Sequence, residues 1–153
     1  MSEPAPVNPF GEGLELSRVP PPSTLVIFGT TGDLTSRKLL PSLYVMQREG
    51  VLPPGFSVVG FGRRPWDHST FREYVRQVLA KNLGDEFDAE VWAGFAPALF
   101  FASGEFDDPA AYERLATLLA DVDRQRVHTG NRLYYLAAPP SAYADIIDGL
   151  GHA

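Results

Sequence analysis

The sequence contains no cysteine, which excludes disulfides, thiolate metal sites and cysteine nucleophiles and is compatible with a reducing cytoplasm. Its three histidines, His68, His128 and His152, are far apart along the chain, so we expect no metal cluster and interpret them as surface residues. No apolar run approaches the roughly 20 residues that a membrane span needs, so we expect no membrane association. Lysine and arginine together number 13 against 19 aspartates and glutamates. This acidic balance argues against nucleic acid as a partner.

The composition is otherwise that of an ordinary globular domain, with 44% hydrophobic and 21% charged residues. A chain of 153 residues is long enough for one real core. Residues 1–22 hold six prolines and little periodicity, so we interpret them as a flexible arm without the features of a secretory signal. We expect residues 23–153 to form the folded domain.

Four short apolar segments alternate with segments of helical periodicity. This alternation predicts an α/β fold, a Rossmann-like doubly wound parallel sheet with helices on both faces. We expect Asp67 or Ser69 to cap one helix and Asp108 to cap another. The expected strands cover 24–28, 56–61, 98–102 and 132–138, and the expected helices cover a segment after Gly32 and residues 70–82, 88–96, 109–122 and 141–150.

The turn after the first expected strand has the features of an anion site. Gly29 and Gly32 bracket two threonines, so the backbone there can bend sharply and approach a ligand closely. A helix begins next, capped by Thr31 or Asp33, and its unpaired N–H groups and dipole favour a phosphate. Pro41 removes a helical hydrogen bond, which predicts a bend near Lys38.

The second expected strand ends in Gly62-Arg63-Arg64. In a βαβ unit this end lies beside the adenosine ribose of a bound dinucleotide, where NAD sites carry an acidic residue. Guanidinium groups at this position favour a 2′-phosphate instead, although a solvated basic turn is the alternative interpretation.

The segment that begins at Gly29 reads Gly-Thr-Thr-Gly-Asp-Leu-Thr-Ser-Arg-Lys-Leu-Leu-Pro-Ser-Leu-Tyr. It resembles the coenzyme motif of the glucose-6-phosphate dehydrogenase family, Gly-x-x-Gly-Asp-Leu-x-x-Arg-Lys-x-x-Pro-x-hydrophobic, and the resemblance continues to near residue 149. It implies an NADP-dependent oxidoreductase that converts glucose 6-phosphate to 6-phosphogluconolactone in the pentose phosphate pathway, cytoplasmic and homo-oligomeric when complete. The resemblance assigns coenzyme binding to Gly29, Thr30, Thr31, Gly32, Asp33, Leu34, Arg63 and Tyr143, and sugar-phosphate binding to Lys38.

Several of these residues have a second interpretation. Asp33 is a helix cap or a catalytic carboxylate, Tyr143 contacts the coenzyme or anchors the last helix, and Lys38 is a substrate contact or a solvated cation. Pro65 replaces a residue that is often basic in the family, so Arg64 is only a possible substitute and NAD remains a possible coenzyme beside NADP.

The family's general base is a histidine within Asp-His-Tyr-Leu-Gly-Lys-Glu, and none of the histidines in this sequence has that context. The sequence therefore resembles the N-terminal coenzyme-binding domain alone, and we expect it to be a truncated piece without the catalytic domain and without turnover. A second hypothesis is that the chain is a stand-alone nucleotide-binding or regulatory module without catalysis. A third hypothesis is that the parent enzyme is a dehydrogenase of another phosphorylated sugar.

Overall fold

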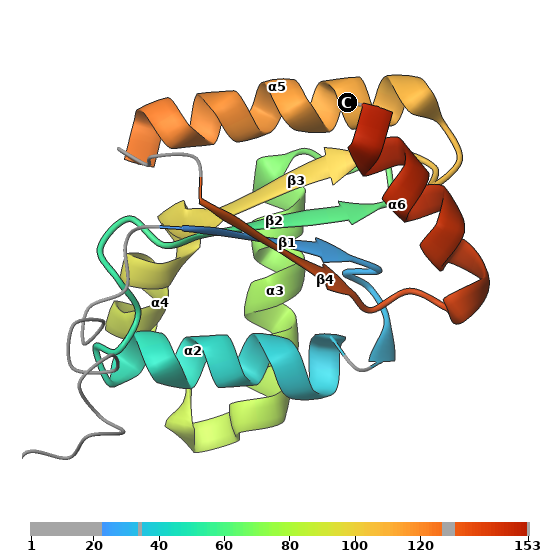
Figure 1. Ribbon diagram of the computed structural model, residues 1–153. Helices are drawn as coiled ribbons and strands as arrows, with labels where there is room; N and C mark the ends of the chain where they lie inside the picture. Colours follow the sequence, from blue (N-terminus) through green and yellow to red (C-terminus); the bar gives the residue numbers. More distant parts are fainter. Residues whose placement is uncertain (1–22, 34, 127–130, 153) are drawn as a thin grey trace, which may run out of the picture.

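The structure is a computed structural model that describes residues 23–33, 35–126 and 131–152. Its strands form one parallel sheet in the order β3-β2-β1-β4 (Figure 1). The chain builds outward from β1 to β3 and then returns to the other side of β1 as β4, which confirms the predicted doubly wound topology. The strands are β1 (Thr24–Phe28), β2 (Ser57–Gly62), β3 (Leu99–Ser103) and β4 (Arg132–Leu136).

Helices cover both faces of the sheet, as predicted. The helices α2, α3 and α4 lie on one face, and α5 and α6 lie on the other (Figure 1). A π-helical turn, Thr35–Leu39, precedes α2, and short 3-10 turns cover Gly84–Glu86, Ala96–Ala98 and Pro140–Ala142. The α-helices are α2 (Leu40–Arg48), α3 (His68–Leu83), α4 (Ala89–Phe95), α5 (Pro109–Arg126) and α6 (Tyr143–His152).

The side chains of β1 alternate between two hydrophobic clusters because successive residues of a strand point to opposite faces. Val26 and Phe28 are fully buried in the cluster beneath α5 and α6. Ile27 is fully buried in the other cluster, against Leu40 and Tyr44 of α2. Since both faces of β1 are covered, the carboxyl end of this strand is held firmly where the glycine turn begins.

The first helix differs from the expectation. Residues Thr35–Leu39 form a π-helical turn, and α2 begins only at Leu40. Pro41 therefore lies in the first turn of α2, a position that tolerates proline. The irregularity expected near Lys38 takes the form of this π-helical turn.

The expected helix caps are present. The carboxylate of Asp67 accepts a hydrogen bond from Thr70 N at 2.7 Å, and that of Asp108 accepts one from Ala110 N at 3.1 Å. Some element ends differ by a few residues. The last strand stops at Leu136 rather than 138, and α6 begins at Tyr143 because a 3-10 turn containing Pro140 comes first.

The interpretation of all three histidines as surface residues is wrong for His68. Its ring is half-buried, and Nδ1 accepts a hydrogen bond from Phe101 N at 3.0 Å. His152 is exposed, and His128 lies outside the described residues. His68 is therefore a structural link between α3 and β3.

The described residues contain no helix that is both long enough and apolar enough to cross a membrane. In the same part of the chain, no group of three or more histidine, aspartate or glutamate side chains is arranged to hold a metal ion. Residues 1–22, interpreted above as an arm, lie outside the described ranges.

Candidate functional site

An open cleft of about 550 Å³ lies at the carboxyl ends of the central strands. It falls where the strand order reverses between β1 and β4, the position at which open α/β sheets bind ligands. The cleft brings together the turn after β1, the end of β2 and the segment after β4. Its lining residues are Gly29, Thr31, Gly32, Gly62, Arg63, Arg64, Pro65, Phe106, Ala137, Ala138 and Pro139.

The turn after β1 leaves little room for side chains at its two glycines. Gly29 has a φ of +89°, and a Cβ there would lie 2.9 Å from the carbonyl carbon and oxygen of Ala137. A Cβ at Gly32 would lie 3.1 Å from Gly29 O, to which Gly32 N donates a hydrogen bond at 2.9 Å. At its two glycines the turn therefore exposes backbone to the cleft, which fits the close approach of an anion.

Thr30 braces this turn from behind. Its side chain is fully buried, and its hydroxyl lies 3.2 Å from Phe61 O and 3.4 Å from Ile27 O. The threonine fits because Gly60 of β2 has no side chain: a Cβ there would lie 2.7 Å from Thr30 Cγ2. The hydroxyl is thus not directed into the cleft, which leaves only the backbone of Thr30 for its predicted role.

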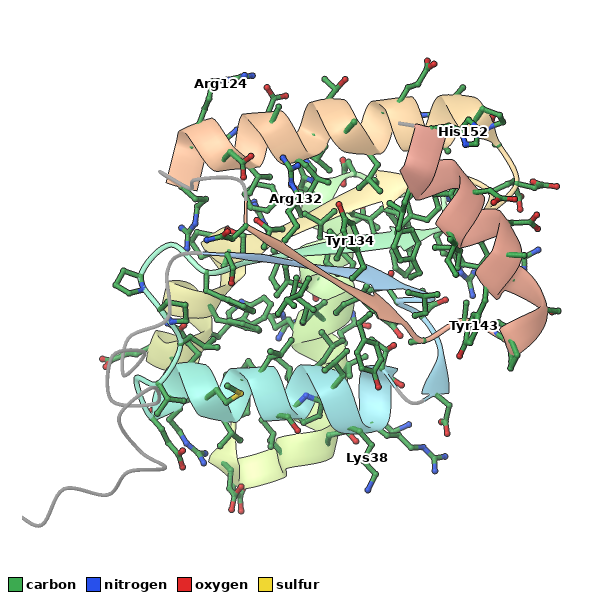
Figure 2. All side chains as sticks on the ribbon, viewed as in Figure 1. Lys38, Arg124, Arg132, Tyr134, Tyr143 and His152 are labelled. Carbon is green, nitrogen blue, oxygen red and sulfur yellow. The ribbon has the colours of Figure 1, made fainter. Side chains whose placement is uncertain are left out.

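The described side chains just after the turn do not line the cleft. The carboxylate of Asp33 pairs with Arg37, with Oδ1 and Nε 2.7 Å apart, and both side chains are exposed. Asp33 accepts no hydrogen bond from a backbone amide within the described ranges, so the capping interpretation is wrong: the arginine one turn further along takes the carboxylate. Lys38 is exposed and projects away from the sheet (Figure 2). Leu34 is outside the described residues.

Arg63 lies at the rim of the cleft, as predicted. Its guanidinium Nε is 3.8 Å from Oε2 of Glu105, a residue that the sequence did not single out. Arg64 also lines the cleft, and its guanidinium carbon lies 5.9 Å from the centre of the Trp66 ring. Tyr143 is exposed at the start of α6 and is not among the lining residues (Figure 2).

The sequence places residues 138–143 at the same crevice, and Ala138 and Pro139 of that segment line the cleft. The sequence does not single out Phe106 or Ala137, although a signal for them exists. Phe106 follows the end of β3, and Ala137 to Pro139 follow the end of β4. Because all carboxyl ends of a parallel sheet meet at one edge, each segment after a strand is a candidate for the site.

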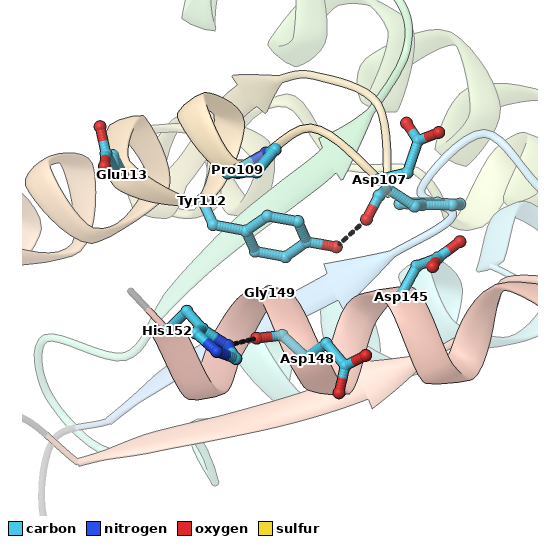
Figure 3. A pocket seen from close by; sticks show the side chains of 9 residues that line it. Asp107, Pro109, Tyr112, Glu113, Asp145, Asp148, Gly149 and His152 are labelled. Carbon is cyan, nitrogen blue, oxygen red and sulfur yellow. Dashed lines mark hydrogen bonds between the residues drawn. The ribbon is translucent and has the colours of Figure 1, made fainter.

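A second cavity, of about 400 Å³, lies between α5 and α6 (Figure 3). Carboxylates of Asp107, Glu113, Asp145 and Asp148 line it, and these would repel the phosphates of a nucleotide. Burial raises the pKa of Tyr112 in its wall to about 12, with added contributions from two of these carboxylates. The glycine-lined cleft is therefore the better candidate for an anionic ligand.

A family model described as the NAD binding domain of glucose-6-phosphate dehydrogenase matches residues 26–153. The glucose-6-phosphate 1-dehydrogenase of Chlamydia pneumoniae is 44% identical over 138 residues, which are 90% of this chain and 27% of that protein. Glucose-6-phosphate 1-dehydrogenase 2 of Mycobacterium tuberculosis strain H37Rv is 37% identical over 88% of this chain and 26% of its own length. The chain thus spans about a quarter of the length of the curated relatives that it matches.

Two solved structures resemble the fold. A glucose-6-phosphate dehydrogenase in complex with its substrate glucose-6-phosphate has a TM-score of 0.75 and 28% identity, over 87% of this chain and 28% of that one. The glucose-6-phosphate 1-dehydrogenase from Mycobacterium avium has a TM-score of 0.73 and 29% identity, over 86% of this chain and 27% of its own.

Proposed function

The chain belongs to the family of glucose-6-phosphate dehydrogenase NAD-binding domains, and on that premise we propose that its cleft binds the nicotinamide coenzyme of a glucose-6-phosphate 1-dehydrogenase. NADP is the coenzyme that Arg63 favours, and NAD is the second candidate. The parent reaction is the oxidation of glucose 6-phosphate to 6-phosphogluconolactone, in which the bound coenzyme accepts a hydride.

The observation that carries this proposal is the glycine turn that exposes backbone to a cleft with an arginine at its rim. The backbone of Gly29, Thr31 and Gly32 would hold the pyrophosphate, because at the two glycines no side chain keeps a ligand away from it. The guanidinium of Arg63 would hold the 2′-phosphate. Coenzyme roles for Thr30, Asp33, Leu34 and Tyr143 stay predictions.

Lys38 is the predicted contact to the sugar phosphate, since an exposed ammonium near the turn would attract a dianion. Among the described histidines, His68 is held by a structural hydrogen bond and His152 is an exposed residue whose Nδ1 lies 2.7 Å from Asp148 O. Neither lines the cleft. We therefore expect the 153-residue chain to bind coenzyme without oxidising the sugar. A homo-oligomeric complete enzyme in the cytoplasm stays a prediction.

Calorimetric titration of the 153-residue chain with NADP, and separately with NAD, tests the proposal. We expect saturable binding of both coenzymes, with NADP bound more tightly. If neither coenzyme produces a saturable heat at millimolar concentration, the cleft of this chain is not a coenzyme site and the proposal is refuted.

A further inference from the structure

The loops that follow β2 and β3 lie side by side at the rim of the cleft. Gly104 N donates a hydrogen bond to Gly62 O at 2.9 Å, which extends the pairing of the two strands by one step beyond Ser103. Arg63 directly follows Gly62, and Glu105 directly follows Gly104. The carboxylate of one loop and the guanidinium of the other are therefore placed together by the sheet itself.

Packing against α5 fixes the backbone of the second loop. A Cβ at Gly104 would lie 2.3 Å from the Cβ of Ala111, so the loop lies directly on the helix. Arg114 donates a hydrogen bond to Ser103 O at 3.2 Å, and Asp108 N donates one to Glu105 O at 3.3 Å. The glutamate is thus held beside the arginine by contacts that do not involve its own carboxylate.

The pair itself is open to solvent, with 74% of the Arg63 side chain and 59% of the Glu105 side chain exposed. An exposed pair with Nε and Oε2 3.8 Å apart contributes little to folding stability. Its exposure leaves the guanidinium free to exchange the carboxylate for another anion. The pair between Arg63 and Glu105 therefore affects ligand binding at the rim more than it affects folding stability.

The two coenzymes differ at this rim by one group. The 2′-phosphate of NADP must compete with the carboxylate of Glu105 for Arg63, and the two anions repel each other. The 2′-hydroxyl of NAD is a hydrogen-bond donor, which a carboxylate accepts well. We infer that Glu105 is a specificity-determining residue that lowers the preference for NADP over NAD. This inference rests on the proposed function of the cleft.

The test is a set of calorimetric titrations of the 153-residue chain and its Glu105→Gln variant with NADP and with NAD. Glutamine keeps the size of the side chain and removes its charge. We expect the ratio of the two dissociation constants to shift towards NADP by up to about fivefold, the upper limit for an exposed charge pair. Asp107→Asn is the matched control, because it removes an exposed carboxylate of the same loop that lines the cavity between α5 and α6 and forms no ion pair with Arg63.

An unchanged ratio in Glu105→Gln, with both coenzymes still bound, overturns this inference and leaves the proposed function intact. An equal shift in Asp107→Asn also overturns it, because the effect would then be one of net charge. If the unaltered chain binds neither coenzyme, the proposed function fails, and the inference fails with it.

Discussion

His68 accepts a hydrogen bond from the backbone of Phe101, with Nδ1 and N 3.0 Å apart. One helical turn further along α3, Arg72 Nε donates to Leu99 O at 2.9 Å. Both backbone groups belong to β3, which is an edge strand of the described sheet. The side chains of His68 and Arg72 thus form hydrogen bonds with backbone groups of β3 that an edge strand would otherwise leave open to pairing with another chain.

This bond makes stability depend on pH. Burial lowers the pKa of His68 below its ordinary value of 6.5, and the charge of Arg72 lowers it further while Asp67 raises it. The unfolded chain therefore binds a proton at a higher pH than the folded chain. The stabilisation is fully present above pH 6.5 and is lost as the pH falls below that value.

We expect the free energy of unfolding to decrease from pH 7.5 to pH 5.5 because of this histidine, since its protonated ring cannot accept the hydrogen bond from Phe101 N. Urea denaturation at both pH values measures it. In His68→Asn, the amide oxygen can still accept from Phe101 N but does not titrate, so the decrease should be smaller. His152→Asn is the control at an exposed histidine. Equal pH dependence in His68→Asn and the unaltered chain would contradict the assignment.

The second prediction concerns the proposed 2′-phosphate contact. Arg63→Ala should weaken NADP binding by about tenfold, because charge-assisted hydrogen bonds to phosphate are strong, and should change NAD binding much less. Arg124→Ala is the matched control, since Arg124 is similarly exposed but pairs with Asp121 on α5, away from the cleft. Calorimetry with both coenzymes measures the two losses. Equal losses for NADP and NAD in Arg63→Ala would remove this residue from the 2′-phosphate role.

The sequence predicts the parts of the fold that depend on local pattern. The apolar run at 24–28 and the glycines after it are typical of a buried parallel strand followed by a tight turn, and the structure has both there. The position of Arg63 at the cleft follows from the sheet topology, because the carboxyl ends of parallel strands meet at one edge. These features need no knowledge of contacts between distant residues.

The features that the sequence does not reveal are contacts between distant segments or choices among local partners. The bond from Phe101 to His68 joins residues that are 33 positions apart, and no spacing rule links them. Glu105 comes to Arg63 only through the pairing of β2 and β3. Asp33 had two local partners, a backbone amide or Arg37, and the ion pair prevails.

The third prediction tests the glycine turn. Gly32→Val should weaken binding of both coenzymes by at least about tenfold, since a Cβ there already lies 3.1 Å from Gly29 O and Gly32 itself lines the cleft. Circular dichroism should show that the domain stays folded. Gly151→Val is the control, because nothing lies within 4 Å of a Cβ at that position and it does not line the cleft. Unaltered coenzyme affinity in Gly32→Val would show that this turn does not hold the phosphates.

The last prediction compares two glycines of α6. Gly149 of α6 faces the ring of Tyr112 (Figure 3), and a Cβ at Gly149 would lie 2.4 Å from Cε2 and Cζ of that ring. A Cβ at Gly151 would meet nothing within 4 Å. The tyrosine ring cannot simply move away, because its hydroxyl donates a hydrogen bond to Phe106 O at 2.7 Å. Gly149→Ala should therefore reduce the free energy of unfolding by about 1–3 kcal/mol, the usual cost of overpacking.

Gly151→Ala should instead leave stability unchanged or raise it by up to about 1 kcal/mol, because alanine is the better helix former. Urea denaturation of the two variants beside the unaltered chain measures both effects under one set of conditions. Since the two substitutions add the same methyl group to the same helix, the difference between them isolates the contact with Tyr112. Equal stability of the two variants would mean that α6 can shift away from α5 without loss, and the close packing of these helices would then contribute nothing to folding.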